Sequence, residues 1–213
     1  MKLYLSSFRL GDHPERLVAL LPPAARVAVI CNSIDAESPA VRREKVAEEI
    51  AWLTELGLQP EELDLRSCTG DALQAALRSY DGVWVRGGNV FVLRAVMAQS
   101  GADQILPELI RSEQIVYAGY SAGPCVLAPS LRGLELCDDA DAVDGEIIWD
   151  GLGLLDHAIV PHLDSPGHPE TELLEKVAGL YVRTGVPYLP MRDGEALVID
   201  GNRRELVKAD RRA

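Results

Sequence analysis

The stretch that decides the fold is IVYAGYSAGPCVL, residues 115–127, in which one apolar run passes through Gly-Tyr-Ser-Ala-Gly into a second apolar run. The first run predicts a buried strand and the second predicts a helix. A serine on a sharp strand-to-helix turn is a nucleophile elbow, which needs small residues on both sides. Gly119 and Gly123 meet that need. The stretch therefore marks Ser121 as a candidate nucleophile, with an ordinary helix N-cap as the alternative role.

The regions around this stretch alternate between strand-like runs and amphipathic helices. The predicted strands are residues 2–7, 26–32, 61–65, 82–88 and 115–120. The predicted helices are residues 38–57, 71–80 and 89–101. This alternation predicts an α/β fold with a doubly wound, mostly parallel sheet and helices on both faces. Sheets of this kind place their ligands at the carboxyl ends of the strands.

After about residue 131 the alternation weakens. Residues 134–155 predict short strands and turns, residues 157–164 predict a further strand, and residues 168–185 predict a helix. Residues 194–209 predict a β-hairpin that turns at Asp200-Gly201 and extends or covers one edge of the sheet. Because the length suits one sizeable core and no linker or repeat interrupts it, we expect residues 1–213 to form a single domain.

Composition excludes several classes of function. The formal net charge of −12 argues against a nucleic-acid partner, which needs a basic face. No apolar run approaches a membrane helix, and the amino terminus lacks a signal-peptide pattern, so we expect a cytoplasmic protein without a membrane partner. The four cysteines form no CxxC pair, and neither a P-loop lysine nor a full dinucleotide glycine pattern is present. We therefore expect no metal and no cofactor.

A serine nucleophile needs a base, and the chain has four histidines. His162 follows Pro161 at the carboxyl end of the predicted strand 157–164, which is the edge where Ser121 is expected. His162 is therefore the favoured base, and His157 is held in reserve. His13 is expected at a surface turn, and His168 is expected to be a solvated residue at a helix start.

Backbone amides could supply an oxyanion hole at the same edge. The strand 82–88 ends in Gly87-Gly88-Asn89 before a helix, so Gly88 N–H and Ala122 N–H would form two donors. A glycine-rich turn without function is the alternative. Asn89, in the same turn, is the candidate for contact with the substrate.

A third residue should orient the histidine. Many carboxylates lie between Ser121 and His162, and most of them must be surface charges. Glu135 is distinctive because it interrupts the apolar run LRGLELC. Asp138 and Asp139 remain open as alternatives.

Taken together, the strand–GYSAG–helix, the upstream GGN turn and the downstream PHLDSPGHPETE resemble the peptidase E family of serine peptidases. This family includes α-aspartyl dipeptidase and shares its fold with class I glutamine amidotransferase-like domains. The resemblance implies that Ser121 is the nucleophile, that His162 is the general base, and that Gly88 and Ala122 form the oxyanion hole. It also implies an acidic residue a short way after the serine, for which Glu135 is our choice.

One position departs from the family pattern. Aspartyl dipeptidases resemble GHKGETR after the catalytic histidine, whereas this chain has Glu172 in place of the arginine that suits an acidic substrate. We therefore expect a serine peptidase or amidohydrolase that cleaves a small peptide without a strict need for aspartate. The alternatives are a strict aspartyl dipeptidase, with Arg86 as the basic residue, and a non-catalytic amidotransferase-like binding domain. Cys125 is expected below the site, and an exposed sheet edge makes a homodimer an open possibility.

Overall fold

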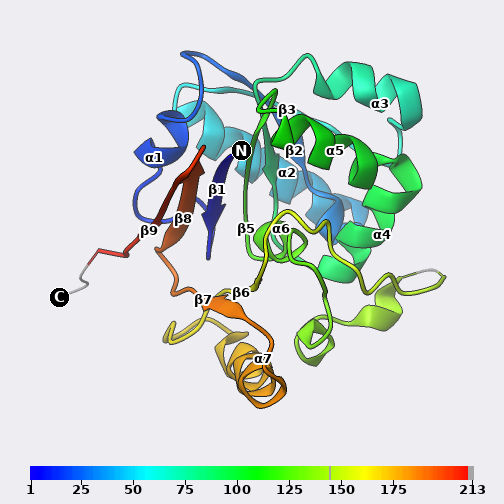
Figure 1. Cartoon of the computed structure of the whole chain (residues 1–213). Helices are drawn as coiled ribbons and strands as arrows, with labels where there is room; N and C mark the ends of the chain where they lie inside the picture. The colour runs from blue at the N-terminus through cyan, green and yellow to red at the C-terminus, as the bar shows by residue number, and fades with distance from the viewer. Residues whose placement is uncertain (144, 211–213) are drawn as a thin grey trace.

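The computed structural model describes residues 1–143 and 145–210. Its main sheet has seven strands in the order β3-β2-β4-β5-β1-β8-β9 (Figure 1). Their bounds are β1 Lys2–Ser6, β2 Arg26–Ile30, β3 Gln59–Glu62, β4 Gly82–Val85, β5 Val116–Tyr120, β8 Ala196–Asp200 and β9 Arg203–Val207. The pairs from β3 to β1 are parallel, whereas β8 is antiparallel to β1 and β9 is antiparallel to β8. The predicted α/β sheet and its carboxyl-terminal hairpin are confirmed.

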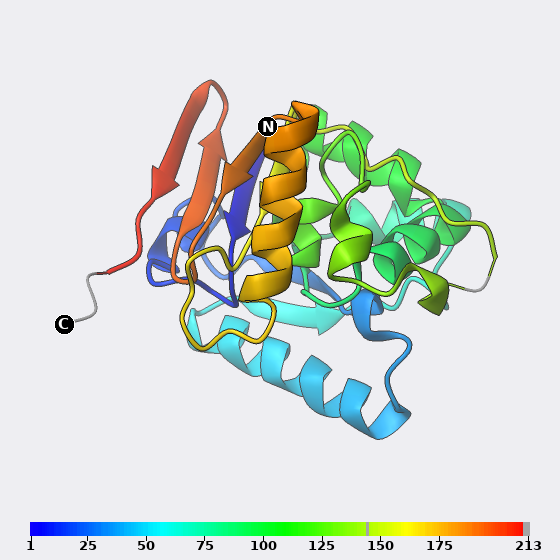
Figure 2. The same ribbon diagram turned by 90° about the horizontal axis from the view of Figure 1, so that it is seen from below.

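Helices cover both faces of this sheet (Figures 1 and 2). Their bounds are α1 Glu15–Val18, α2 Pro39–Glu55, α3 Gly70–Leu77, α4 Val90–Ser100, α5 Ala102–Arg111, α6 Ala122–Cys125 and α7 Thr171–Thr184. Buried side chains form two clusters, one shared by the sheet with α1 and α2 and the other shared with α3 to α7. None of the described helices is both long and apolar enough to span a bilayer.

Helix α2 follows the sequence signals closely. The hydroxyl of Ser38 accepts the N–H of Val41 at 3.4 Å, and Pro39 occupies the first turn, where its missing N–H costs nothing. Val46 and Leu53 face the sheet. Glu49 lies on this inner face as well and is only 1% exposed, so a carboxylate is buried behind the carboxyl ends of the central strands.

Three short elements were not expected: α1, α5 and β7 (Tyr188–Pro190). The predicted strand 61–65 begins earlier, as β3 at Gln59, because its register is set by pairing with β2. In residues 134–155 the expected short strands are wrong for the part of this segment that the structure describes. Two 3-10 helices, Leu134–Leu136 and Ala140–Ala142, lie there instead, and the described part of the segment adds one isolated bridge, between Ser130 and Asp150.

The predicted strand 157–164 is shorter than expected and lies outside the main sheet. It is β6 (Ala158–Val160), which pairs in parallel with β7 in a separate two-stranded sheet. His162 and Asp164 have φ values of 56° and 49°, and this left-handed backbone ends the strand. The chain therefore turns sharply at the histidine.

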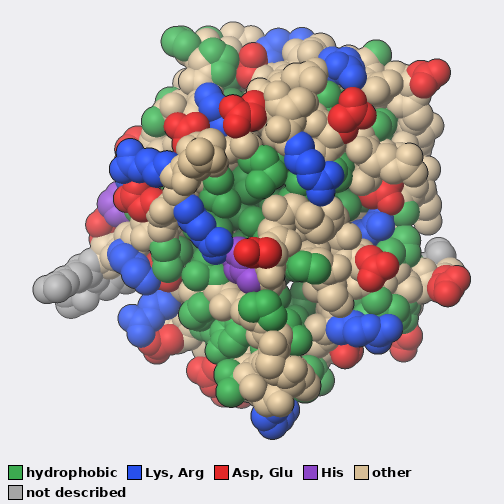
Figure 3. All heavy atoms as spheres, in the orientation of Figure 1, with side chains coloured by type: hydrophobic (Ala, Val, Ile, Leu, Met, Phe, Trp, Pro, Cys, Tyr) green, Lys and Arg blue, Asp and Glu red, His purple; other side chains and the backbone are tan. Residues whose placement is uncertain are grey.

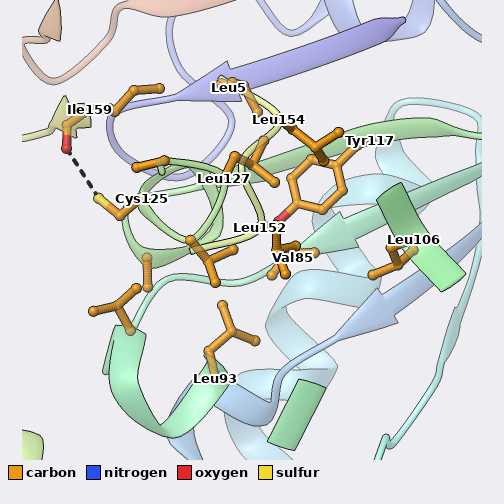
Figure 4. Close-up of a cluster of buried hydrophobic side chains, with 14 of the residues drawn as sticks. Leu5, Val85, Leu93, Leu106, Tyr117, Cys125, Leu127, Leu152, Leu154 and Ile159 are labelled. Carbon is orange, nitrogen blue, oxygen red and sulfur yellow. Dashed lines mark hydrogen bonds between the residues drawn. The ribbon is translucent and has the colours of Figure 1, made fainter. Parts of the chain in front are cut away.

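Buried apolar side chains surround Cys125 and Leu127 below the elbow (Figure 4). The hydroxyl of Tyr117 donates to the carbonyl of Gly123 at 2.8 Å, and Cys125 Sγ lies 3.4 Å from the carbonyl oxygen of Ile159 in β6. Burial raises the pKa of the Cys125 thiol well above its usual range. Cys125 is therefore a packing residue that joins α6 to β6.

The two glycines that flank Ser121 are required by a close approach between β5 and β4. In the sheet register Val85 stands opposite Gly119. A Cβ atom placed on Gly119 or on Gly123 would collide with the carbonyl oxygen of Val85. No larger residue fits without separating the elbow from the end of β4, so this contact fixes the elbow against the sheet.

We predict that Gly119→Ala lowers the free energy of unfolding by about 2 kcal/mol or more, because backbone atoms cannot move aside as a flexible side chain would. Equilibrium urea unfolding measures this. The matched control is Gly179→Ala in α7, where the nearest atom to the new Cβ is the end of the Arg183 side chain at 3.4 Å. That control should raise stability by roughly 0.5–1 kcal/mol. Wild-type stability in Gly119→Ala would contradict the packing described here.

Candidate active site

Ser121 lies on a strained turn between β5 and α6. Its φ and ψ are 52° and −110°, a region that residues with a side chain rarely adopt. Its N–H donates to the carbonyl of Ser6 at 3.4 Å, which ties the turn to the end of β1. Strain of this kind costs about 1–3 kcal/mol and persists only where the surrounding structure imposes it. The geometry is that of a nucleophile elbow.

Two unoccupied amide donors stand beside the elbow. Gly88 has φ 142°, and a Cβ there would lie 2.8 Å from the carbonyl oxygen of Ser33, so only glycine fits. Within residues 1–143 and 145–210, neither Gly88 N–H nor Ala122 N–H has a hydrogen-bond acceptor. Both residues are therefore free to donate to a substrate oxygen, as the oxyanion-hole prediction requires.

Asn89 has a different task from the one predicted. Its side-chain oxygen accepts the N–H groups of Phe91 and Val92 at 2.9 and 3.1 Å, which caps α4. Its side-chain nitrogen donates to the carbonyl of Asp139 at 2.7 Å. Asn89 therefore holds the turn together, and its contact with a substrate stays a prediction.

His162 is paired with a carboxylate that the sequence analysis did not select. Its imidazole is 1% exposed, and Nδ1 lies 2.6 Å from Oδ1 of Asp193. A carboxylate at Nδ1 keeps the proton there and leaves Nε2 as the acceptor that a general base needs. Nε2 faces the Glu170 carboxylate at 4.0 Å, a separation that leaves the nitrogen without a direct protein hydrogen bond.

Asp193 is prepared for this role by its neighbours. Burial opposes its ionisation, but the hydrogen bonds from His162 and Ser7 and the favourable electrostatics of the neighbouring imidazoles outweigh burial and lower the pKa of Asp193. Ser7 Oγ donates to the same carboxylate at 3.1 Å and accepts the backbone N–H of His162 at 2.9 Å. Ser165 Oγ accepts the N–H of Asp193 at 2.9 Å. Ser7 and Ser165 therefore hold the His162–Asp193 pair in place.

Glu135, the predicted third member, is not the partner of His162 in this structure. Its Oε2 accepts the N–H of Gly133 at 2.5 Å, so a local turn explains why a carboxylate interrupts the apolar run. Asp139 caps the 3-10 helix at Ala140–Ala142. Asp138 accepts the N–H of Val90 at 2.8 Å. The carboxylates of Glu135, Asp138 and Asp139 therefore all accept backbone N–H groups in loops or at helix starts.

Asp193 was missed because the acids considered were those between Ser121 and His162 in sequence. It lies in the run PMRDG, three residues after the end of β7, a strand that the sequence analysis did not recognise. The available signal was an acid that follows a short strand and precedes a glycine.

Ser121 and His162 lie at the same edge of the sheet. Consecutive residues at the end of β1 bind both of them, since the Ser6 carbonyl accepts the N–H of Ser121 and the Ser7 hydroxyl accepts the N–H of His162. The Phe8 ring contacts the rings of His162 and Tyr120, with centroids 5.7 and 6.3 Å apart. Figure 3 shows this face of the molecule, with an apolar hollow bordered by a histidine and by charged side chains. The structure brings the two predicted residues to one region.

The other histidines have identifiable partners. His157 lies between Asp156, at 2.6 Å from Nδ1, and Arg204, at 2.8 Å from Nε2, so it links β6 to the hairpin. His13 contacts Glu15 and Asp210 at the surface, as predicted. His168 was expected to be solvated, but it stacks on His162 with centroids 3.6 Å apart and planes 4° apart.

One group of side chains in the described part of the chain has the composition of a metal site. Ligand atoms of His162, His168 and Glu170 lie within 4.8 Å of one another. The two imidazoles are parallel, however, so their in-plane lone pairs point side by side and do not converge on one point. Both rings could ligate one ion only after a rotation, and the geometry therefore favours a stacked pair.

Two charged residues were considered in connection with binding of an acidic substrate. Arg86, suggested as a binding site for an acidic substrate, is turned inward, where its Nε lies 3.2 Å from Oε1 of the buried Glu49. Glu172, in the position of the family's arginine, is exposed in the first turn of α7. Neither residue provides a cation for a substrate carboxylate.

Asp138 predicts a measurable pH dependence. Burial, reinforced by the charge of Glu170, raises its pKa to about 6. The native state therefore binds a proton that the unfolded state releases near pH 4, so stability falls as pH rises from about 4 to about 6. Because the residue is half-buried, we expect Asp138→Asn to be more stable than the wild type by on the order of 1–2 kcal/mol at pH 8, and this gain should vanish near pH 4.

Urea unfolding of both proteins from pH 4 to pH 8 measures this difference. Asp141→Asn, a change at an exposed neighbour, serves as the control and should differ little from the wild type across the range. A gain in Asp138→Asn that is independent of pH would contradict the assignment.

Comparison with known proteins shows that this chain is similar to a family of peptidases. A model described as peptidase family S51 matches residues 35–207. An uncharacterised peptidase of Listeria monocytogenes is 27% identical over 186 residues, which cover 87% of this chain and 83% of the relative. Peptidase E of Streptomyces coelicolor is 35% identical over 141 residues, 64% of this chain and 56% of the relative.

The fold agrees with this result. A crystal structure from Listeria monocytogenes, provisionally described as a peptidase E, superposes with a TM-score of 0.84 at 25% identity and covers 98% of both chains. The match extends over the strand–elbow–helix unit and the segment that carries His162. The chain belongs to peptidase family S51, a family of serine peptidases, and it is a hydrolase of peptide bonds.

Proposed function

We propose that this peptidase cleaves small peptides with Ser121 as nucleophile, His162 as general base and Asp193 as the residue that orients His162. The observation that carries the proposal is the contact between the buried His162 and the half-buried Asp193, joined at 2.6 Å, at the sheet edge that also holds the strained Ser121. Gly88 N–H and Ala122 N–H are the proposed oxyanion hole. Asp193 replaces Glu135 in the assignment made from sequence.

The chemistry follows from these positions. Ser121 Oγ attacks the peptide carbonyl while His162 Nε2 takes its proton, and Asp193 stabilises the imidazolium that results. The carbonyl oxygen becomes an oxyanion that accepts from Gly88 N–H and Ala122 N–H. His162 then returns the proton to the leaving amine. Water, activated by the same imidazole, hydrolyses the acyl-enzyme and restores Ser121.

The surroundings of the site support a small peptide that need not be acidic. An open depression of about 980 Å³ adjoins the site, with Phe8 and Asp193 in its lining. The cations that also line it have carboxylate partners, since Arg192 pairs with Asp164 and Lys208 pairs with Glu195. A substrate carboxylate would have to compete with these pairs, so a strict aspartyl specificity is the weaker candidate.

We also propose that residues 1–213 act as one domain in the cytoplasm. All four cysteines are free, which suits a reducing compartment. The net charge of −12 supports the absence of a nucleic-acid partner. The outer edge of β9 is the place where a homodimer would form by strand pairing.

We predict that Ser121→Ala abolishes labelling by a serine-directed fluorophosphonate and reduces peptide hydrolysis to background. Asp193→Asn should lower kcat by about 10²–10⁴-fold, because the amide cannot hold the reactive tautomer. Glu135→Gln is the matched control and should stay within about threefold of the wild type, since its carboxylate binds only a local N–H. Intact-mass spectrometry and steady-state kinetics measure both effects. Equal losses in the two acid variants would refute the assignment of Asp193.

We predict that a dipeptide panel shows no strict need for aspartate. Ala-Leu and Glu-Leu should be hydrolysed with kcat/KM within about tenfold of Asp-Leu, because Arg86 is committed to Glu49 and Glu172 would repel an acidic side chain. The rates are obtained by measuring the released leucine by chromatography. Turnover of Asp-Leu alone would show instead a strict α-aspartyl dipeptidase.

A further inference from the structure

A buried carboxylate on α2 connects the two sides of the proposed oxyanion hole. Glu49 Oε1 accepts the hydroxyl of Tyr120 at 2.7 Å and lies 3.2 Å from Arg86 Nε, while Oε2 accepts the indole N–H of Trp84 at 2.7 Å. Tyr120 and Trp84 donate hydrogen bonds to this carboxylate, and Arg86 adds a positive charge beside it without a hydrogen bond from Nε. Tyr120 immediately precedes Ser121, and Arg86 immediately precedes Gly87.

Arg86 controls the direction of one oxyanion donor. Its Nη1 donates to the carbonyl of Gly87 at 2.6 Å, and Ser33 Oγ donates to the same oxygen at 2.8 Å. That carbonyl and the N–H of Gly88 belong to one planar trans peptide, so they point in opposite directions. Two donors on the inner side therefore turn the Gly88 N–H outward, toward the site.

Tyr120 sets the spacing between the two donors. A Cβ on Gly87 would lie 2.8 Å from the Tyr120 ring and 2.9 Å from Ser121 Cβ, so the Gly87 peptide rests directly on the elbow. The Tyr120 ring is 5% exposed, and its hydroxyl ends on Glu49. A movement of this ring would displace the Gly87–Gly88 peptide relative to the Ala122 N–H.

We infer that Glu49 and Arg86 are positioning residues for catalysis: through the Gly87 carbonyl and Tyr120 they hold the two oxyanion donors at a fixed direction and separation. This inference rests on the proposed function and extends it to residues that touch neither substrate nor Ser121. It also explains why a 1% exposed carboxylate stands behind the sheet edge. Burial raises the pKa of Glu49, and Tyr120, Trp84 and Arg86 oppose that rise.

The experiment compares Glu49→Gln, Arg86→Lys and Asp103→Asn with the wild type. Glu49→Gln exchanges one accepting oxygen for a donor. Arg86→Lys keeps the positive charge, but one compact ammonium group replaces the two separate nitrogens that face Glu49 (Nε) and the Gly87 carbonyl (Nη1). Asp103→Asn is the matched control, because it weakens another mostly buried ion pair, with Arg94 at 3.0 Å, that contacts neither donor.

Active-site titration with the fluorophosphonate counts the competent sites, and kcat is expressed per titrated site. Glu49→Gln and Arg86→Lys should lower this kcat by about 10–100-fold with KM within about threefold, since the donors matter most in the transition state. Asp103→Asn should keep the wild-type value. A fall in the number of titrated sites with an unchanged kcat per site would mean that Glu49 serves folding alone, and it would overturn the inference.

Hydrogen exchange tests the same inference without turnover. Peptides that cover residues 83–91 and 118–126 should exchange faster in Glu49→Gln than in the wild type, whereas Arg86→Lys should affect chiefly the first. Wild-type exchange of both peptides in Glu49→Gln would overturn the inference. Absence of any fluorophosphonate label on wild-type Ser121 would instead overturn the proposed function, and the exchange result would still decide the role of Glu49.

Discussion

The contact between the Val85 carbonyl and the two glycines around Ser121 is the constraint on which the site depends. Val85 ends β4 and stands opposite Gly119 in β5, so the elbow is pressed against the last peptide of the neighbouring strand. The chain can turn there only with an unusual backbone at Ser121. The same contact brings the elbow beside the glycine turn that continues β4, so both proposed oxyanion donors depend on it.

Two carboxylates, the half-buried Asp193 and the buried Glu49, then define what the site can do. Asp193 binds the imidazole of His162, and Glu49 binds Arg86 together with Tyr120. Each accepts hydrogen bonds from neighbouring side chains, which favour its ionised form, and at Glu49 burial opposes that form and raises the pKa. In the proposed mechanism one carboxylate orients the base and the other orients the backbone. Both act through other groups while Ser121 performs the chemistry.

The sequence predicted the parts of this arrangement that depend on local pattern. The elbow, Gly88 and His162 each lie at the end of a strand-like run, and their positions follow from the period of the apolar residues and from glycine at fixed places. The parallel sheet and the final hairpin follow from the same periodicity. These features require no knowledge of distant contacts.

The remaining features depend on contacts between distant parts of the chain. Asp193 is 31 residues from His162, and it follows a short strand, β7, that pairs with β6 outside the main sheet. Glu135 was selected because it interrupts an apolar run. In the structure its carboxylate accepts the N–H of Gly133 in a local turn, and the apolar pattern gives no sign of this contact. Glu49 sits in an otherwise ordinary amphipathic helix, and its burial becomes evident only when α2 is placed on the sheet.

The most direct test of the account is a crystal structure of the protein after reaction with a fluorophosphonate. The account predicts phosphorus bonded to Ser121 Oγ, one phosphonyl oxygen about 2.7–3.1 Å from both Gly88 N and Ala122 N, and His162 Nε2 within hydrogen-bond reach of the adduct. An adduct on another residue, or a phosphonyl oxygen turned away from both amides with His162 out of reach, would contradict it.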